Sequence, residues 1–204
     1  AIHYSFFSPA DLKLFRYPEG SEALRAIRIL NPISEELSLM RTVLSPSMAN
    51  AVMRNQKAGN LSGRLFELAK VFIPKSLPLT DYPEERAHLA FAFFGKEESF
   101  FTLKGALDLA AESLHVKFRY EASTEPFTHP YQTAAVYVGE VKVGYLGKLA
   151  YDIAGELNLR TDAYLAELDL DTIESLPHEP VYFTPLPKFP EVQRDLALVM
   201  DKAI

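Results

Sequence analysis

A two-residue hydrophobic period runs through residues 134–149, whose sequence is AAVYVGEVKVGYLGKL. Alternation of this kind places successive side chains on opposite faces of a strand. The pattern turns back at Gly139-Glu140, and Gly at the first central position fits a two-residue type II′ turn. The segment therefore predicts an antiparallel β-hairpin, and with it a fold that contains an antiparallel sheet.

Further strands are expected on both sides of this hairpin. Residues 88–94, HLAFAFF, are nearly all apolar, so we expect an interior strand with both faces covered. Short runs of apolar and β-branched residues bounded by Pro, Ser or Asn predict the other strands. These strands are expected over residues 2–7, 24–30, 64–73 and 164–170.

Two clear helices are predicted between the strands. Residues 44–58 begin with Ser45 as the N-cap and Pro46 at the first helical position, and Leu44, Met48, Ala51 and Val52 form an apolar stripe. Residues 101–115 show a second apolar stripe, and a short helical stretch is expected after Ser34. Because no regular βαβ rhythm appears, the predicted fold class is α+β, a mainly antiparallel sheet flanked by helices.

The composition excludes several classes of protein. With 204 residues, 48% of them hydrophobic, the chain is long enough and apolar enough to bury a sizeable core. The absence of Cys excludes a disulfide scaffold and fits a reducing compartment, so we expect a cytoplasmic location. No apolar run approaches the ~20 residues that span a bilayer, and the N-terminus lacks a basic signal-peptide region. The chain has no initiator Met and ends with RDLALVMDKAI, where a new strand is expected to begin, so we expect a piece of a longer protein.

Charge is unevenly distributed along the chain. The net charge is −6, which argues against a free-standing nucleic-acid binder. Residues 41–75 nevertheless carry a local charge of +5, because they contain six cations and the single acid Glu67. The cations are Arg41, Arg54, Lys57, Arg64, Lys70 and Lys75. They form either a basic patch for a partner or a solvated surface, and the second interpretation is the more common one.

Candidate chemistry is sparse. Glu167, Asp169 and Asp171 alternate along a predicted strand, so their carboxylates either bind Mg²⁺ or Ca²⁺ together or form a solvent-facing side. We favour the solvent-facing side. The five histidines lie far apart in sequence, and neither a phosphate-binding G-x-x-x-x-G-K-[ST] loop nor a G-x-G-x-x-G motif occurs. We therefore predict no catalytic, cofactor-binding or metal-ligating residue.

Residues 31–55, NPISEELSLMRTVLSPSMANAVMRN, followed by LFELAKVF, resemble the phenylalanyl-tRNA synthetase beta-subunit family of bacteria. Downstream, LKGALDLAAESL, THPYQTAAVYVGEVKVGYLGKL and PLPKFPEVQRDLALVM resemble later parts of that family in the same order. The resemblance covers the chain from about Ile2 to its end, and Met40-Arg41-Thr42 after Ser34-Glu35-Glu36 is its most specific part. Departures occur at Ser45-Pro46-Ser47, Ala69 and Thr102.

The resemblance implies a class II synthetase-like core without catalysis. A working class II site needs one Arg in its motif 2 strand and a second Arg in motif 3, because these cations stabilise charge on the transferring phosphate. Here the strand LFELAKVFIPKS offers Lys70 and no Arg, and KLAYDIAGELNL contains no Glu-Arg pair. Lysine does not reproduce the two-pronged contact of Arg, so we predict that the chain alone is inactive.

The resemblance also implies a domain division and a set of partners. We expect a non-catalytic core over residues 1–176, a linker over 177–190 and the start of a ferredoxin-like anticodon-binding domain over 191–204. The expected partner is the catalytic alpha subunit in an (αβ)₂ heterotetramer of phenylalanine–tRNA ligase. ATP, Mg²⁺ and tRNA(Phe) belong to the whole enzyme, and no cofactor is expected in this chain.

Candidate partner contacts are Arg41, Arg54, Lys57 and Arg64. Aromatic and Met residues belong either to an interface or to the core, a choice left open for Phe6, Phe7, Met48 and Met53. Two alternatives to a structural role remain: an active ligase, and an RNA-binding module that uses the basic segment 41–75.

Overall fold

The structure of the chain is a computed structural model that describes residues 1–180, 182–183, 185–186, 188–189, 192 and 194–201. Its centre is a six-stranded antiparallel sheet with the strand order β3-β4-β8-β7-β6-β5. The strands are β3 Gly63–Ile73, β4 Glu84–Phe94, β5 Phe118–Ala122, β6 Thr128–Val138, β7 Val141–Leu149 and β8 Ala163–Asp169. The predicted α+β class with a mainly antiparallel sheet is confirmed.

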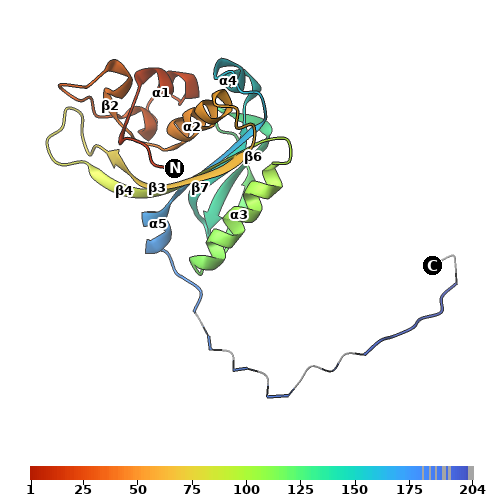
Figure 1. Cartoon of the computed structure of the whole chain (residues 1–204). Helices are drawn as coiled ribbons and strands as arrows, with labels where there is room; N and C mark the ends of the chain where they lie inside the picture. The colour runs from red at the N-terminus through yellow and green to blue at the C-terminus, as the bar shows by residue number, and fades with distance from the viewer. Residues whose placement is uncertain (181, 184, 187, 190–191, 193, 202–204) are drawn as a thin grey trace.

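Helices cover both faces of the sheet (Figure 1). One face carries α1 Pro9–Phe15, α2 Ser45–Lys57 and α4 Tyr151–Glu156, which pack on a core that includes Leu44, Val71 and Leu165. The other face carries α3 Phe100–Ser113 and α5 Leu170–Ser175 over a second core around Leu107 and Leu146. No helix in the described part of the chain has the length and hydropathy needed to cross a membrane.

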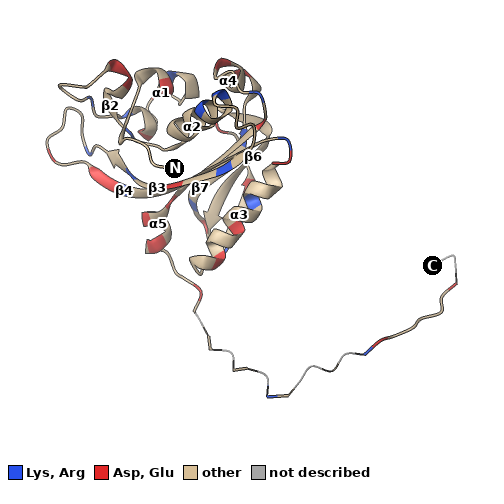
Figure 2. Ribbon diagram, viewed as in Figure 1, with Lys and Arg blue, Asp and Glu red and all other residues tan. Residues whose placement is uncertain are grey.

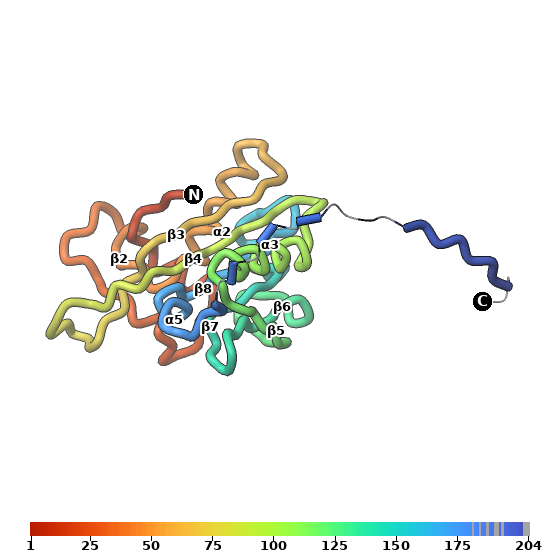
Figure 3. Tube along the Cα trace, turned by 90° about the horizontal axis from the view of Figure 1, so that it is seen from below, coloured from red at the N-terminus to blue at the C-terminus, as the bar shows by residue number. Residues whose placement is uncertain are grey.

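A smaller unit lies beside α1 and α2. It contains the two-residue strands β1 Phe6–Phe7 and β2 Leu39–Met40, and the 3₁₀ helices η1 Glu22–Leu24 and η2 Glu35–Leu37. Figure 3 shows these N-terminal segments gathered at one end of the molecule, near β3 and β4. This unit therefore covers the β3 end of the sheet on the α2 side.

The hairpin and both long helices agree with their predictions. Val138 pairs with Val141 around the turn, and Gly139 has a φ of +58° while Glu140 has no positive φ, as a type II′ turn requires. The helices predicted over 44–58 and 101–115 are α2 and α3. Strands β3 and β8 agree with their predicted ranges to within one residue. Strand β4 begins four residues before its predicted start and is interior, between β3 and β8.

Three local predictions are wrong. Residues 24–30 form no strand; their one bridge, Arg28 to Leu39, pairs with a strand of two residues. Of residues 2–7 only Phe6–Phe7 is a strand, because its partner β2 is only two residues long. Before it, the Arg41 side chain donates to Tyr4 O, and His3 N donates to the Glu67 carboxylate. Leu44 rather than Ser45 is the N-cap of α2, since a carboxylate from the sheet replaces the capping hydroxyl.

The chain leaves this body after α5 (Figure 1). The described residues among 177–201 belong to no helix or strand, and residues 181, 184, 187, 190–191, 193 and 202–204 lie outside the described part. The predicted linker over 177–190 and the domain start over 191–204 fall partly on those residues. The domain division therefore stays a prediction.

Gly144 marks the tightest backbone approach in the sheet. A Cβ added there would lie 2.1 Å from the carbonyl oxygen of Glu167 on β8. We expect Gly144→Ala to lower the free energy of unfolding by about 3 kcal/mol, because two paired strands must separate to admit the methyl group. Urea denaturation followed by circular dichroism measures the change.

Gly105 provides the matched control for that substitution. It lies inside α3, where an added Cβ has no neighbour within 4 Å. Gly105→Ala is expected to raise the free energy of unfolding by up to about 1 kcal/mol through helix propensity. Equal effects of the two substitutions would contradict this account of Gly144.

Candidate functional site

Two buried glutamates lie in one row across the sheet. Glu67 on β3 is paired with Ala90 on β4, and Ala90 is paired with Glu167 on β8. Ala90 is fully buried under the helices of the α2 side, so side chains of this row point towards α2. Two interstrand spacings separate the glutamates, about 10 Å. Each anchors a different part of the chain to the sheet.

Glu167 holds the beginning of α2. Its carboxylate accepts hydrogen bonds from Leu44 N at 2.9 Å, from Ser45 N at 2.9 Å and from Ser45 Oγ at 2.6 Å. The first amides of a helix carry partial positive charge, so a buried carboxylate is stabilised there. His88 Nδ1 of β4 lies 2.7 Å from the same carboxylate, which is 4% exposed.

The two ionisable groups of this centre shift each other's pKa. Burial by itself raises the pKa of the Glu167 carboxyl, but the hydrogen bond and charge of His88, with the bonds from Ser45 and Leu44, outweigh burial and bring the pKa below its ordinary value. Burial by itself lowers the pKa of His88, but the carboxylate of Glu167 outweighs it and raises that pKa. The geometry is therefore that of a buried ion pair.

The other glutamate of the row, Glu67, anchors Arg41 and the N-terminal segment. Arg41 Nη1 lies 3.0 Å from Glu67, and Arg41 Nε donates to Lys70 O at 2.8 Å. His3 also contacts the Glu67 carboxylate. Burial by itself raises the pKa of Glu67. The contacts of His3 and the charge of Arg41 lower it by more than burial raises it, so the pKa lies below its ordinary value.

Residues 41–45 therefore cross the sheet from one glutamate to the other. Arg41 lies on Glu67, Thr42 donates to Ala23 O at 2.6 Å, and Ser45 lies on Glu167. The polar side chains of Arg41, Thr42 and Ser45 are therefore all bonded inside the molecule. The specific Met40-Arg41-Thr42 pattern thus has a packing explanation.

The four predicted partner contacts occupy different environments. Arg41 is 3% exposed and fully engaged by Glu67, so its side chain is not on the surface. Arg64 is exposed and pairs with Glu98 at 2.8 Å. Arg54 and Lys57 are exposed near the end of α2, and neither has an ion-pair partner among the described residues. Figure 2 shows basic residues in blue on the ribbon of α2. The structure thus leaves Arg54 and Lys57 as the unpaired surface cations of the set.

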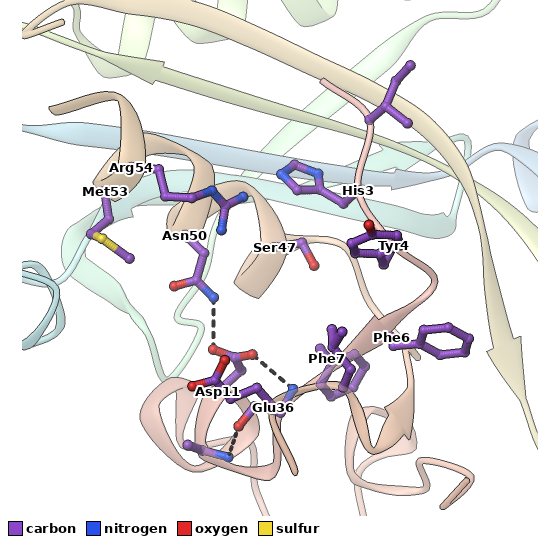
Figure 4. A pocket seen from close by; sticks show the side chains of 14 residues that line it. His3, Tyr4, Phe6, Phe7, Asp11, Glu36, Ser47, Asn50, Met53 and Arg54 are labelled. Atoms are coloured by element: carbon purple, nitrogen blue, oxygen red, sulfur yellow. Dashed lines mark hydrogen bonds between the residues drawn. The ribbon is translucent and has the colours of Figure 1, made fainter. Parts of the chain in front are cut away.

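A pocket of about 890 Å³ lies beside Arg54 (Figure 4). The N-terminal segment, α1, η2 and α2 form it, and Phe6, Phe7 and Met53 give it an apolar wall. Its Asp11 carboxylate is already bonded by Asn50 Nδ2 at 2.8 Å and Ser8 N at 3.0 Å. The pocket can therefore receive an apolar group with a carboxylate near Arg54.

The aromatic and Met residues left open by the sequence divide between core and pocket. Met48 is fully buried and Phe7 is 3% exposed, so both belong to the core, although Phe7 also reaches the pocket wall. Phe6 and Met53 are half-buried and line the pocket. Only the second pair is available to a partner.

The acidic run 167–171 is neither a metal site nor a solvent-facing side, so both interpretations of it are wrong. Glu167 caps α2, Asp169 caps α5 by accepting from Thr172 N at 3.0 Å, and Asp171 accepts from Ala87 N at 3.0 Å. The described residues contain no group of three His, Asp or Glu side chains placed to hold a metal. A charged residue inside the apolar stretch YLAEL was the available signal, because such a residue needs a buried partner.

Strand β3 carries no cation towards the α2 side. Val71 is fully buried and Ile73 is 5% exposed, and both are part of the α2-side core. Lys70 is exposed, and its Nζ donates to Glu85 O at 3.3 Å. The positions around Phe72 are therefore filled by apolar packing.

Comparison with known proteins identifies the family of this chain. The family model described as "Phenylalanyl tRNA synthetase beta chain CLM domain" matches residues 1–170. The phenylalanine–tRNA ligase beta subunit of Clostridium tetani is 36% identical over the whole chain, and that of Moorella thermoacetica is 35% identical over 98% of it. The chain spans about a quarter of the length of these relatives, 26% in both.

The fold also resembles a solved synthetase. Pyrrolysyl-tRNA synthetase from Desulfitobacterium hafniense superposes with a TM-score of 0.64 at 13% identity. The match covers 85% of this chain and 61% of that one. At this identity the likeness concerns the fold alone.

The Glu167 centre predicts a strong and specific stability effect. Glu167→Gln replaces an acceptor by an amide donor that faces other donors, so we expect the free energy of unfolding to fall by about 3 kcal/mol. Glu174→Gln, on the exposed side of α5, is the control and is expected to change it by less than about 0.5 kcal/mol. Equilibrium denaturation in urea at neutral pH compares the two variants.

The same centre predicts the pH dependence of stability. The raised pKa of His88 means that its contribution is complete below its ordinary value of 6.5 and is lost as pH rises through the folded-state value. The lowered pKa of Glu167 means that its contribution is present above 4.5 and is lost as pH falls through the folded-state value. Unfolding free energy should therefore decline on raising the pH from 6.5, and His88→Gln should flatten that decline, whereas His178→Gln should leave it unchanged.

Proposed function

The chain belongs to the phenylalanyl-tRNA synthetase beta-chain CLM-domain family, and from that premise we propose that it is a structural, non-catalytic module of a phenylalanine–tRNA ligase. In this proposal the module packs against the catalytic alpha subunit in an (αβ)₂ heterotetramer of the cytoplasm. It supports aminoacylation of tRNA(Phe), for which ATP and Mg²⁺ are bound elsewhere in the enzyme. The observation that carries the proposal is a synthetase-like fold whose β3 strand has apolar core residues around Phe72.

The chemistry of amino-acid activation supports this reading. Charge that develops on the transferring phosphate requires fixed cations, and Arg is preferred because its guanidinium makes two parallel contacts. At the end of β3, Val71 and Ile73 belong instead to the α2-side hydrophobic core, which also includes Leu165 and residues of α2. Helix α4, with sequence YDIAGE, contributes no cation either. The chain thus has a synthetase-like fold, and apolar side chains fill the α2 side of the sheet at the end of β3.

The pocket beside Arg54 supplies a surface for the proposed alpha subunit. It combines an apolar wall with an exposed cation that has no partner among the described residues. Interfaces favour such an arrangement, with Phe, Met and Arg at the centre. The neighbouring Tyr4 and Ile2 are 72% and 98% exposed and extend the apolar area. We therefore assign the alpha-subunit contact to this face.

The absence of catalysis is directly testable. The 204-residue chain, mixed with phenylalanine, ATP and Mg²⁺, is expected to give pyrophosphate exchange no higher than a reaction without protein, because β3 lacks a phosphate-holding Arg. The complete ligase from the same source serves as the positive control. Exchange above background by the chain alone would establish an active ligase and reject the structural role.

The proposed contact face predicts a charge-reversal effect. Co-expression with the cognate alpha subunit, followed by size-exclusion chromatography and titration, measures the complex. Arg54→Glu is expected to weaken it about tenfold or more, because the substitution places a carboxylate at the pocket rim. Lys57→Glu makes the same charge change on the same helix, but Lys57 does not line the pocket, so this variant should bind as the unmodified chain does. Equal binding by both variants would remove the pocket from the interface.

A further inference from the structure

Three separate segments meet at the end of the sheet where β4 stops and β8 begins. Gln56 of α2 donates to Thr161 Oγ1 at 2.9 Å and accepts from Arg160 N at 2.6 Å. Gly95, directly after β4, donates through its backbone N–H to Asp162 O at 3.1 Å. These bonds fix the C-terminal end of α2, the residues after β4 and the loop between α4 and β8 relative to one another. We call this place the three-segment junction.

Each segment contributes a cation to the junction surface. Lys57 follows Gln56, Lys96 follows Gly95, and Arg160 itself belongs to the bonded loop. All three are exposed, and the described residues provide none of them with an ion-pair partner. The three cations come from positions far apart in the sequence. Only Lys57 belongs to the basic segment 41–75.

Nearby acids are mostly neutralised. Asp162 pairs with Lys148 at 2.7 Å, and Glu98 pairs with Arg64 at 2.8 Å. Glu97 is the remaining exposed acid of the segment after β4. Three unpaired cations therefore face one unpaired acid, and the junction is locally basic on a chain whose net charge is −6.

A pocket of about 500 Å³ opens at the junction, and an aromatic ring forms part of it. Its lining includes Lys96, Arg160 and Tyr151. Tyr151 is 62% exposed, yet its hydroxyl accepts from Lys148 Nζ at 3.0 Å and its ring packs edge-on against His129 with centroids 5.4 Å apart. The same Lys148 Nζ lies over the ring, 4.5 Å from its centroid. These contacts hold the ring in place, and its exposed part is accessible to a ligand.

We infer that the three-segment junction binds a single-stranded stretch of RNA, with phosphates on Lys57, Lys96 and Arg160 and one base stacked on Tyr151. Cations spread over three segments suit a row of phosphates better than one isolated phosphate group. Aromatic stacking beside a basic groove is how proteins bind single strands without reading their sequence. Neither Gln56 nor Lys57, the residues that α2 gives to the junction, lines the Arg54 pocket, so this inference does not depend on the proposed contact with the alpha subunit.

The test measures binding of a fluorescein-labelled single-stranded RNA to the 204-residue chain by anisotropy over a series of salt concentrations. Lys96→Ser and Arg160→Ser are each expected to weaken binding and to reduce the slope of log affinity against log salt by about 0.7 to 1, one phosphate contact each. Tyr151→Ser is expected to weaken binding about tenfold with the slope unchanged, and Tyr151→Phe to retain it, because stacking needs only the ring.

Lys142→Ser is the distant control, because Lys142 lies near the start of β7 while Lys148, which reaches the junction, lies near its end, about 20 Å away. Lys142 pairs with Glu125 at 2.9 Å. It should leave the affinity and the salt slope unchanged. Unlabelled inorganic phosphate and AMP are titrated as competitors and should displace the RNA only weakly. Absence of RNA binding, equal effects of Lys142→Ser and Arg160→Ser, or full displacement by AMP at concentrations matching the RNA would each overturn the inference.

Discussion

The carboxylate of Glu167 determines how the α2 side of this molecule is assembled. It joins the amide end of α2 to β8 and, through His88, to β4. A helix terminus buried without acceptors would leave several N–H groups unpaired, and a buried carboxylate without donors would be equally costly. The amides at the start of α2 and the Glu167 carboxylate therefore satisfy each other's hydrogen-bonding groups. The position of α2 fixes, in turn, the side chains that it contributes to the Arg54 pocket and to the three-segment junction.

Glu67, in the same row across the sheet as Glu167, likewise anchors a segment of the chain through its buried carboxylate. Because Glu67, Ala90 and Glu167 are aligned across three strands, the chain from Arg41 to Ser45 is held at both of its ends. The spacing between the anchors, about 10 Å, is within reach of four extended residues. The small side chain of Ala90 between them leaves room for this segment. The Met40-Arg41-Thr42 pattern, part of the most specific stretch of the family resemblance, is accordingly explained by the assembly of the core.

Hydrophobic periodicity predicted the helices and strands that depend on residues close together in the sequence. It did not predict features that depend on contacts between residues far apart in the sequence. The hairpin around Gly139, helix α3 and strand β4 all follow from local patterns. Ser45 was predicted as the N-cap because no sequence pattern connects it to Glu167, which lies 122 residues further along the chain. The roles of Glu167 and Asp171 were not predicted for the same reason, because their hydrogen-bond partners lie far away in the sequence. The Arg54 pocket was equally hidden, since its lining comes from four separate elements.

The packing of β3 shows why a catalytic cation could not simply be restored in this fold. Val71 and Ile73 are buried at 0% and 5% exposure and pack in the α2-side core. An Arg at either position would bring an unpaired charge into that core, at a cost of several kcal/mol. The carboxylates within this layer are already engaged, Glu67 by Arg41 and Glu167 by His88. An unpaired phosphate-holding cation at these positions would therefore lower the stability of the core, which supports the proposed scaffold role.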